Sequence, residues 1–175
     1  MSNKLLVVIG GPTGVGTTDM AIRLARHYQT EIICADSRQV STELNIGVGR
    51  PSASQLNAIP HHLIGHISIH QDYSVAHYTN QALHILDELF LHHDMVILTG
   101  GTGLYVKAIM EGFDDIPKVE EGITERWTAL WKEQGIESLL KSLKDLDPAY
   151  LDIVDKANPR RIIRALAVSE STGKP

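Results

Sequence analysis

Short apolar runs alternate with amphipathic stretches over roughly the first hundred residues of the chain. The runs LLVVI and MVIL are continuous, which is typical of strands buried on both faces of a sheet. Between them lie segments whose apolar positions recur at helical spacing. The pattern predicts strands over 5–9, 31–36 and 95–98, and helices over 17–27 and from Ser74 onward. Strands that alternate with helices favour an α/β fold with a parallel sheet.

The character of the sequence changes near Gly112, after which the apolar positions follow only the helical period. Two capping residues that precede prolines and one glycine mark helix ends in this part: Asp147-Pro148, Asn158-Pro159 and Gly173. We therefore expect an α/β core over residues 1–112 and a helical insertion or extension over residues 113–175. The two tryptophans at helical spacing, Trp127 and Trp131, are expected in the core of the helical part.

Composition narrows the class of protein. The chain has 175 residues, of which 43% are hydrophobic and 21% charged, as in an ordinary folded domain. A single cysteine, Cys34, excludes an internal disulfide framework and a cysteine-based zinc site. The first apolar run is too short for a signal peptide or a membrane span. We expect a cytoplasmic protein, a monomer without membrane contact.

Charge is unevenly distributed. The formal net charge of -5 argues against a protein that binds nucleic acid over its whole surface. Residues 155–175 nevertheless carry five basic and two acidic side chains. Composition alone favours a solvated helix face for these basic residues, and a contact with phosphate or nucleic acid is the alternative.

A glycine-rich turn follows the first predicted strand and precedes the first predicted helix. The candidate phosphate-binding residues are Gly11, Pro12, Thr13, Gly14, Val15, Gly16, Thr17 and Thr18. Such a loop points backbone N–H groups and the positive end of a helix dipole at a phosphate. The usual pattern is G-x-x-x-x-G-K-[ST], and Thr17 stands at the lysine position. The pattern favours phosphate binding, with a tight turn that holds no ligand as the alternative.

Two further polar turns follow predicted strands. Asp36 begins the turn DSRQ and could serve as a general base, orient a metal, or cap a helix. Thr102 offers a hydroxyl within GGTGLY. Because the carboxyl ends of parallel strands meet at one sheet edge, we expect all three turns to converge there.

Several segments together carry a family resemblance that spans essentially all of residues 5–175. They are GPTGVGTT, ADSRQV, PHHLIGH, YSVAHY, LTGGTGLYVKAIMEG and NPRRIIRALAVSESTGKP. In this order they resemble the tRNA dimethylallyltransferases. The resemblance implies a P-loop NTPase-like core and magnesium-assisted transfer of a dimethylallyl group from dimethylallyl diphosphate. The implied acceptor is the exocyclic amine of the tRNA adenosine that adjoins the anticodon, in the anticodon stem-loop.

The resemblance also implies roles for matching residues. The loop from Thr13 to Thr18 would hold the donor diphosphate, with Thr18 near Mg²⁺. Asp36 would take a proton from the adenine amine, and Thr102 would lie at the reaction centre. The residues implied to contact the flipped adenine and nearby tRNA are Asp36, Ser37, Arg38 and Gln39. The residues implied to contact tRNA further along the chain are Arg160, Arg161, Ile162, Ile163 and Arg164.

The chain departs from the family pattern at three positions. Thr17 replaces the loop lysine, Ser41 stands where tyrosine usually follows DSRQV, and Gly65 stands where aspartate usually follows PHHLI. Family members run to about twice this length, so we expect a fragment or a truncated product. The alternatives are an adenylate isopentenyltransferase, a P-loop kinase of small metabolites, and a non-catalytic nucleotide- or tRNA-binding paralogue. A zinc site is an alternative for His61, His62, His66 and His70, but His61 and His62 belong to a matched family segment, which favours a structural or substrate-domain role.

Overall fold

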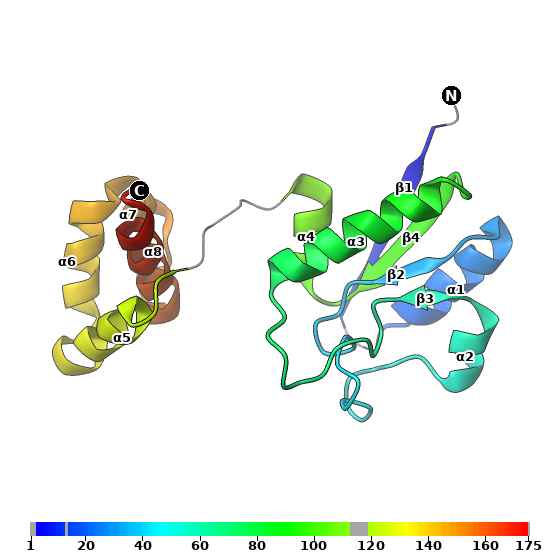
Figure 1. The fold of residues 1–175 in the computed structure, drawn as a ribbon, viewed down its shortest axis with the longest axis horizontal. Helices are drawn as coiled ribbons and strands as arrows, with labels where there is room; N and C mark the ends of the chain where they lie inside the picture. Colours follow the sequence, from blue (N-terminus) through cyan, green and yellow to red (C-terminus); the bar gives the residue numbers. More distant parts are fainter. Residues whose placement is uncertain (1–2, 13, 113–118, 175) are drawn as a thin grey trace. The chain divides into compact units, whose positions relative to one another are not determined.

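The computed structural model describes residues 3–12, 14–112 and 119–174. The chain divides into two compact units, Met1–Asp114 and Asp115–Pro175, and each is described by itself (Figure 1). The expected boundary at residue 113 lies outside the described residues. Across the parts of the chain that the structure describes, every helix is too short or too polar to span a membrane.

The first unit, called here the α/β unit, is built on a four-stranded sheet. Its strands are β1 (Leu5–Gly10), β2 (Ile32–Cys34), β3 (His61–His62) and β4 (Met95–Gly100). All neighbouring strands are parallel, in the order β1-β4-β2-β3. The helices of this unit are α1 (Thr17–Tyr28), α2 (Ala53–Ala58), α3 (Val75–Phe90) and α4 (Gly103–Glu111). The predicted α/β class with a parallel sheet is confirmed.

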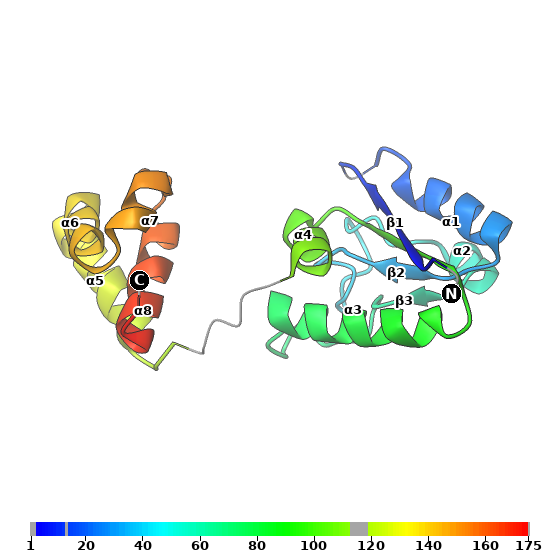
Figure 2. The ribbon, with the colours of Figure 1, turned by 90° about the horizontal axis from the view of Figure 1, so that it is seen from above.

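Helices cover both faces of the sheet (Figure 2). On one face α1 packs Ala21, Ile22 and Ala25 against the strands. On the other face α3 and α4 bury Tyr78 and Tyr105 among strand residues, and these two rings stack with centroids 3.9 Å apart. The central strands β4 and β2 are therefore buried on both sides, which explains their continuous apolar sequences.

Three elements of the α/β unit did not show in the sequence pattern. The helix α2 has six residues and begins with a capping box made by Ser52 and Gln55. The strand β3 has two residues, which pair with Ile32 and Ile33 of β2. The helix α4 follows directly from the turn after β4. Elements as short as α2 and β3 do not complete enough periods to be recognised from hydrophobic spacing.

The second unit, called here the helical unit, consists of helices in the described residues 119–174. They are α5 (Ile123–Gln134), α6 (Ile136–Leu146), α7 (Pro148–Ile153) and α8 (Pro159–Thr172). Leu139, Leu143 and Leu166 are fully buried at its centre. Trp127 and Trp131 pack against this core, as the sequence predicted.

Helix ends in the helical unit follow the capping signals in the sequence. The Asp147 carboxylate accepts a hydrogen bond from Tyr150 N at 2.9 Å, and the Asn158 side chain accepts one from Arg161 N at 3.3 Å. Gly173 ends α8 in the left-handed region, with φ of 65°. These predicted caps are confirmed.

Candidate functional site

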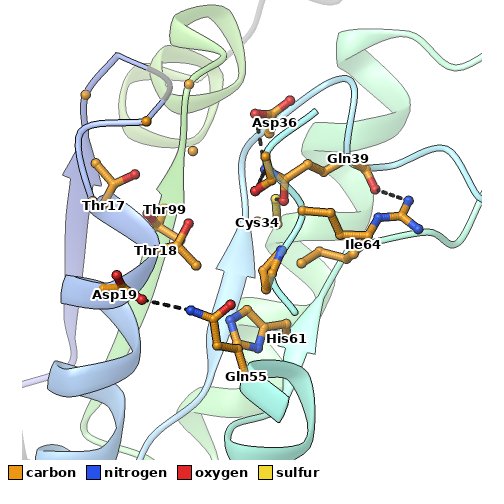
Figure 3. Close-up of a pocket in the computed structure, with 18 residues that line it drawn as sticks. Thr17, Thr18, Asp19, Cys34, Asp36, Gln39, Gln55, His61, Ile64 and Thr99 are labelled. Carbon is orange, nitrogen blue, oxygen red and sulfur yellow. Dashed lines mark hydrogen bonds between the residues drawn. The ribbon is translucent and has the colours of Figure 1, made fainter. Parts of the chain in front are cut away.

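A pocket of about 310 Å³ lies at the carboxyl edge of the sheet in the α/β unit (Figure 3). Residues of the glycine loop, of the turn after β2 and of the turn after β4 all line it, and the segment 49–64 adds a further wall. Figure 3 shows Thr17, Thr18 and Thr99 on one side and Asp36, Gln39 and His61 on the other. The structure thus brings together the three polar turns that the sequence singled out.

The glycine loop ends where α1 begins. Gly16 precedes the helix in the left-handed region, with φ of 96°, and no side chain caps the helix. The first N–H groups of α1 therefore keep their donors for a ligand, beside the Thr17 and Thr18 side chains that line the pocket. Pro12 lines a separate cavity beside α4, and Thr13 lies outside the described residues.

The turn after β4 passes very close to the turn after β2. A β-carbon added at Gly100 would lie 2.2 Å from the carbonyl oxygen of Ala35, so only glycine fits there. This contact lets Thr102 N donate to Ala35 O at 3.0 Å. The Thr102 hydroxyl joins the two turns further, because the backbone N of Ser37 donates to Thr102 Oγ1 at 2.9 Å and Thr102 Oγ1 donates to Ser37 Oγ at 3.2 Å.

The carboxylate of Asp36 is held in place by two donors. Its Oδ1 accepts from Arg38 N at 2.9 Å, and its Oδ2 accepts from Gln39 Nε2 at 3.4 Å. Gln39 is itself buried, and its Nε2 also lies 3.2 Å from the carbonyl oxygens of Val48 and Gly49. Since a carboxylate offers about four acceptor positions, Asp36 keeps capacity to accept a proton or approach a cation.

Two residues of the segment 49–64 place nitrogen atoms at the pocket, and sequence reasoning missed both as site residues. His61 Nδ1 lies 2.7 Å from Ile59 O, so Nδ1 carries the hydrogen and Nε2 presents its lone pair. That Nε2 is buried without a partner, and burial lowers the pKa of His61. Arg50 also lines the pocket, and its Nε is likewise buried without a partner in the described residues.

Cys34 lies at the floor of the same pocket. Burial raises the pKa of its thiol to about 12, and its Sγ donates to Gln39 Oε1 at 3.5 Å. A buried thiol that stays protonated is a poor nucleophile. The structure therefore gives Cys34 a packing role beside Gln39.

Oxygen atoms suited to a divalent cation also line this pocket. The Thr18 hydroxyl and the Asp36 carboxylate both face it, and Mg²⁺ prefers oxygen ligands. In the residues that the structure describes, no three His, Cys, Asp or Glu side chains gather as a complete metal site. A cation in this pocket would therefore need further oxygen ligands, which a bound phosphate supplies.

The basic segment RRIIR begins α8 in the helical unit. Arg160, Arg161 and Arg164 are exposed. Ile162 and Ile163 are buried in the core of the unit with 0% and 6% of their surface exposed. The arginines are therefore the members of this segment whose side chains are open to RNA, and the implied tRNA contacts of Ile162 and Ile163 stay a prediction.

Comparison with known sequences gives the family. The model of the IPP transferase family matches residues 39–175. The tRNA dimethylallyltransferase 1 of Bacteroides thetaiotaomicron is 45% identical over 169 residues, which cover 97% of this chain and 55% of that relative. The tRNA dimethylallyltransferase of Christiangramia forsetii is 47% identical over 175 residues, which cover 100% of this chain and 58% of that relative. The chain thus spans just over half the length of these relatives.

Solved structures agree on the fold. The full-length tRNA isopentenylpyrophosphate transferase from Bacillus halodurans has a TM-score of 0.61 at 33% identity, covering 99% of this chain and 57% of its own. A eukaryotic dimethylallyltransferase acting on tRNA has a TM-score of 0.81 at 24% identity, covering 98% of this chain and 43% of its own. The P-loop NTPase-like core and the family resemblance are confirmed. Because the family model matches well over half of its residues, the chain belongs to the IPP transferase family.

Proposed function

We propose that the protein transfers a dimethylallyl group from dimethylallyl diphosphate to the exocyclic amine of the tRNA adenosine that adjoins the anticodon. The observation that carries this proposal is a single pocket that joins a phosphate-binding loop to the carboxylate of Asp36. Family membership supports the choice of donor and acceptor. A kinase would also use the loop, and both kinds of enzyme usually carry the lysine that Thr17 replaces, so family membership is what favours the prenyltransferase.

The donor diphosphate is proposed to bind at the start of α1. The uncapped N–H groups of the first turn and the residues Gly14 and Gly16 face the pocket there. The Thr18 hydroxyl would hold Mg²⁺, which would supply positive charge to the departing diphosphate. These groups stabilise charge that grows on the leaving oxygen, so they act more strongly in the transition state than in the bound donor.

The acceptor is proposed to enter beside Asp36. The adenine amine forms a bond to the allylic carbon while the bond from that carbon to the diphosphate oxygen breaks. The amine proton passes to a free position on the Asp36 carboxylate, and diphosphate leaves. A base stacked in an anticodon loop cannot reach this depth, so the adenosine must be flipped out of its stack.

Neighbouring side chains have positioning roles in this proposal. Gln39 Nε2 donates to Asp36 Oδ2 from the buried side, so its proposed role is to orient the carboxylate rather than to contact RNA. Thr102 and Ser37 fix the turns against each other at the entrance to Asp36. Arg38, which is exposed, is proposed to contact the RNA backbone. The exposed arginines Arg160, Arg161 and Arg164 are proposed to contact tRNA phosphates.

The proposal is tested by a transfer assay with two acceptors. The protein is incubated with Mg²⁺ and labelled dimethylallyl diphosphate, and with either an anticodon stem-loop RNA or adenosine monophosphate. We expect label in the RNA alone, and we expect Thr17→Lys to raise the rate because it restores a cation beside the leaving group. Label in the nucleotide alone would identify an adenylate isopentenyltransferase. Binding of donor and RNA without transfer, even in Thr17→Lys and in a protein extended to the length of its relatives, would identify a non-catalytic paralogue.

A further inference from the structure

The phosphate loop of this chain lacks its usual cation. Thr17 occupies the lysine position, and its side chain carries no charge. A diphosphate bound at the loop brings several negative charges into a pocket of about 310 Å³. Among the described residues that line this pocket, Arg50 is the one arginine or lysine.

The direct contacts of Arg50 in the described residues do not include a carboxylate, although the carboxylates of Asp19 and Asp36 line the same pocket. Nη1 donates to Asn45 Oδ1 at 2.6 Å, and Nη2 donates to the backbone carbonyls of Gln39, at 3.2 Å, and Ser41. All three acceptors are neutral, and Nε is buried without an acceptor. The ion pairs found in the described residues do not include Arg50. A cation on a pocket wall without a carboxylate partner attracts an anion into that pocket.

Gly65 explains why no carboxylate neutralises Arg50. A β-carbon added at Gly65 would lie 3.3 Å from both Nη1 and Nη2 of Arg50. An aspartate at this position, where the family pattern usually has one, would therefore place its carboxylate on the guanidinium. This chain lacks both the loop lysine and that aspartate. Relative to the family pattern, one positive and one negative charge are therefore lost together.

We propose that Arg50 is the cation of the donor site in this chain and takes the electrostatic place of the missing loop lysine. The inference rests on the proposed function, because it names a further residue for the diphosphate at the same pocket. In the structure the three hydrogen bonds of Arg50 go to neutral acceptors, and no side chain at position 65 competes for it, so a bound diphosphate would draw the guanidinium to the stronger charge-assisted bonds. Its planar fork then suits the bidentate recognition that arginine gives to phosphate oxygens.

The test measures binding of inorganic pyrophosphate and of dimethylallyl diphosphate by calorimetry, without RNA and without turnover. Arg50→Gln should weaken binding of both ligands about tenfold or more, as expected for a lost charge-assisted hydrogen bond. Arg23→Gln, on the exposed side of α1, is the matched control and should leave both affinities unchanged. Thr17→Lys added to Arg50→Gln should restore binding, which would not happen if Arg50 only supported the loop fold.

A second pair of variants tests the role of Gly65 without removing Arg50. Gly65 has φ of +56°, so Gly65→Asp and Gly65→Asn impose the same backbone strain, which both residues tolerate comparatively well. Only the aspartate brings a charge to the guanidinium. We expect Gly65→Asp to weaken pyrophosphate binding about as much as Arg50→Gln, and Gly65→Asn to bind several-fold more tightly than Gly65→Asp.

Two results would overturn the inference in different ways. If Thr17→Lys tightens pyrophosphate binding while Arg50→Gln and Gly65→Asp leave it unchanged, the loop holds the diphosphate but Arg50 is not its cation. If Thr17→Lys also leaves binding unchanged, the donor site itself is misplaced, and the proposed function fails together with the inference. Equal weakening by Gly65→Asp and Gly65→Asn would show that strain, not charge, acts at position 65.

Discussion

The α/β unit and the helical unit differ in how they use polar side chains. In the described α/β unit the buried polar residues are Thr30, Gln39, Ser41, Thr79 and Thr99. In the described helical unit the buried polar residue is Ser169. Burying a polar group is unfavourable unless it finds hydrogen-bond partners. The free-energy cost of burying polar groups is therefore concentrated in the α/β unit, where Gln39 and Thr99 line the pocket.

The α/β unit therefore positions the reacting groups, and the helical unit supplies packing and exposed charge. Gln39 uses its amide to bind Asp36 and the loop carbonyls that shape one wall of the pocket. The helical unit instead closes a core of leucines and isoleucines and leaves its arginines in solvent. We therefore expect substitutions in the α/β unit to change transfer and donor binding, and substitutions in the helical unit to change its own stability.

The largest effect is expected at Asp36. Asp36→Ala should lower the rate of prenyl transfer about 10²–10⁴-fold, because the amine loses the group that accepts its proton. Affinity for the diphosphate should stay the same or improve, since a negative charge leaves the pocket. The measurement is single-turnover transfer to an anticodon stem-loop, with calorimetry for the donor. Asp87→Ala, on the exposed side of α3, is the control, and a transfer rate for Asp36→Ala within a few-fold of the unmodified protein would exclude the proposed base.

The next largest effect is expected in the core of the helical unit. Leu166 is fully buried, so Leu166→Ala should destabilise that unit by about 2–5 kcal/mol through lost burial and a cavity. Both tryptophans of the chain lie in this unit, so tryptophan fluorescence during urea unfolding follows it selectively.

Two measurements make the Leu166 prediction specific. Pyrophosphate binding should be unchanged in Leu166→Ala, because the donor pocket lies wholly in the α/β unit. Leu146→Ala, at a site 40% exposed, should shift the fluorescence transition by less than about 1 kcal/mol. A loss of pyrophosphate binding in Leu166→Ala would show that the units are energetically coupled.

The strands and the polar turns could be predicted from the sequence because the local pattern of apolar and polar residues determines them. The strand β4 reads as a continuous apolar run because both of its faces are buried, and the edge strand β1 reads in the same way because helices pack against both of its faces, although its residues are only partly buried. Asp36 and Thr102 were identified as candidates because they come directly after strands, and parallel strands end at one edge. Site residues whose place depends only on their distance from a strand end could therefore be predicted.

Arg50 and His61 could not be assigned to the site in the same way. They reach the pocket because β3 adds to the sheet edge beside β2 and the preceding segment folds over it. A two-residue strand has no hydrophobic period, so nothing local predicts that pairing. The segment RRIIR teaches a related point. Helical spacing places the side chains of Ile162 and Ile163 on the buried side of α8 with Leu166, so a contiguous motif does not by itself say which of its side chains reach solvent.

A smaller effect is expected at the start of α8. The Asn158 side chain accepts from Arg161 N, so Asn158→Ala should destabilise the helical unit by about 1 kcal/mol. The exposed Asn80 inside α3 serves as the control, and Asn80→Ala should not shift the fluorescence transition. The same fluorescence unfolding measures both variants. An unchanged midpoint for Asn158→Ala would mean that packing alone fixes the start of α8.

The smallest effect concerns pH and Glu43 in the α/β unit. Hydrogen bonds from the hydroxyls of Ser68 and Thr42 and from Ile69 N lower the pKa of Glu43 from 4.5 to about 2. A carboxyl whose pKa is lower in the folded state contributes stability above its unfolded pKa, and the contribution is lost as pH falls toward the folded pKa. Between about pH 4.5 and pH 2, protection of the Thr42 amide, which donates to Ile67 O, should therefore decrease in hydrogen exchange corrected for intrinsic rates. Glu43→Gln should flatten this dependence, whereas an equal decrease in Glu43→Gln would assign it to another carboxyl.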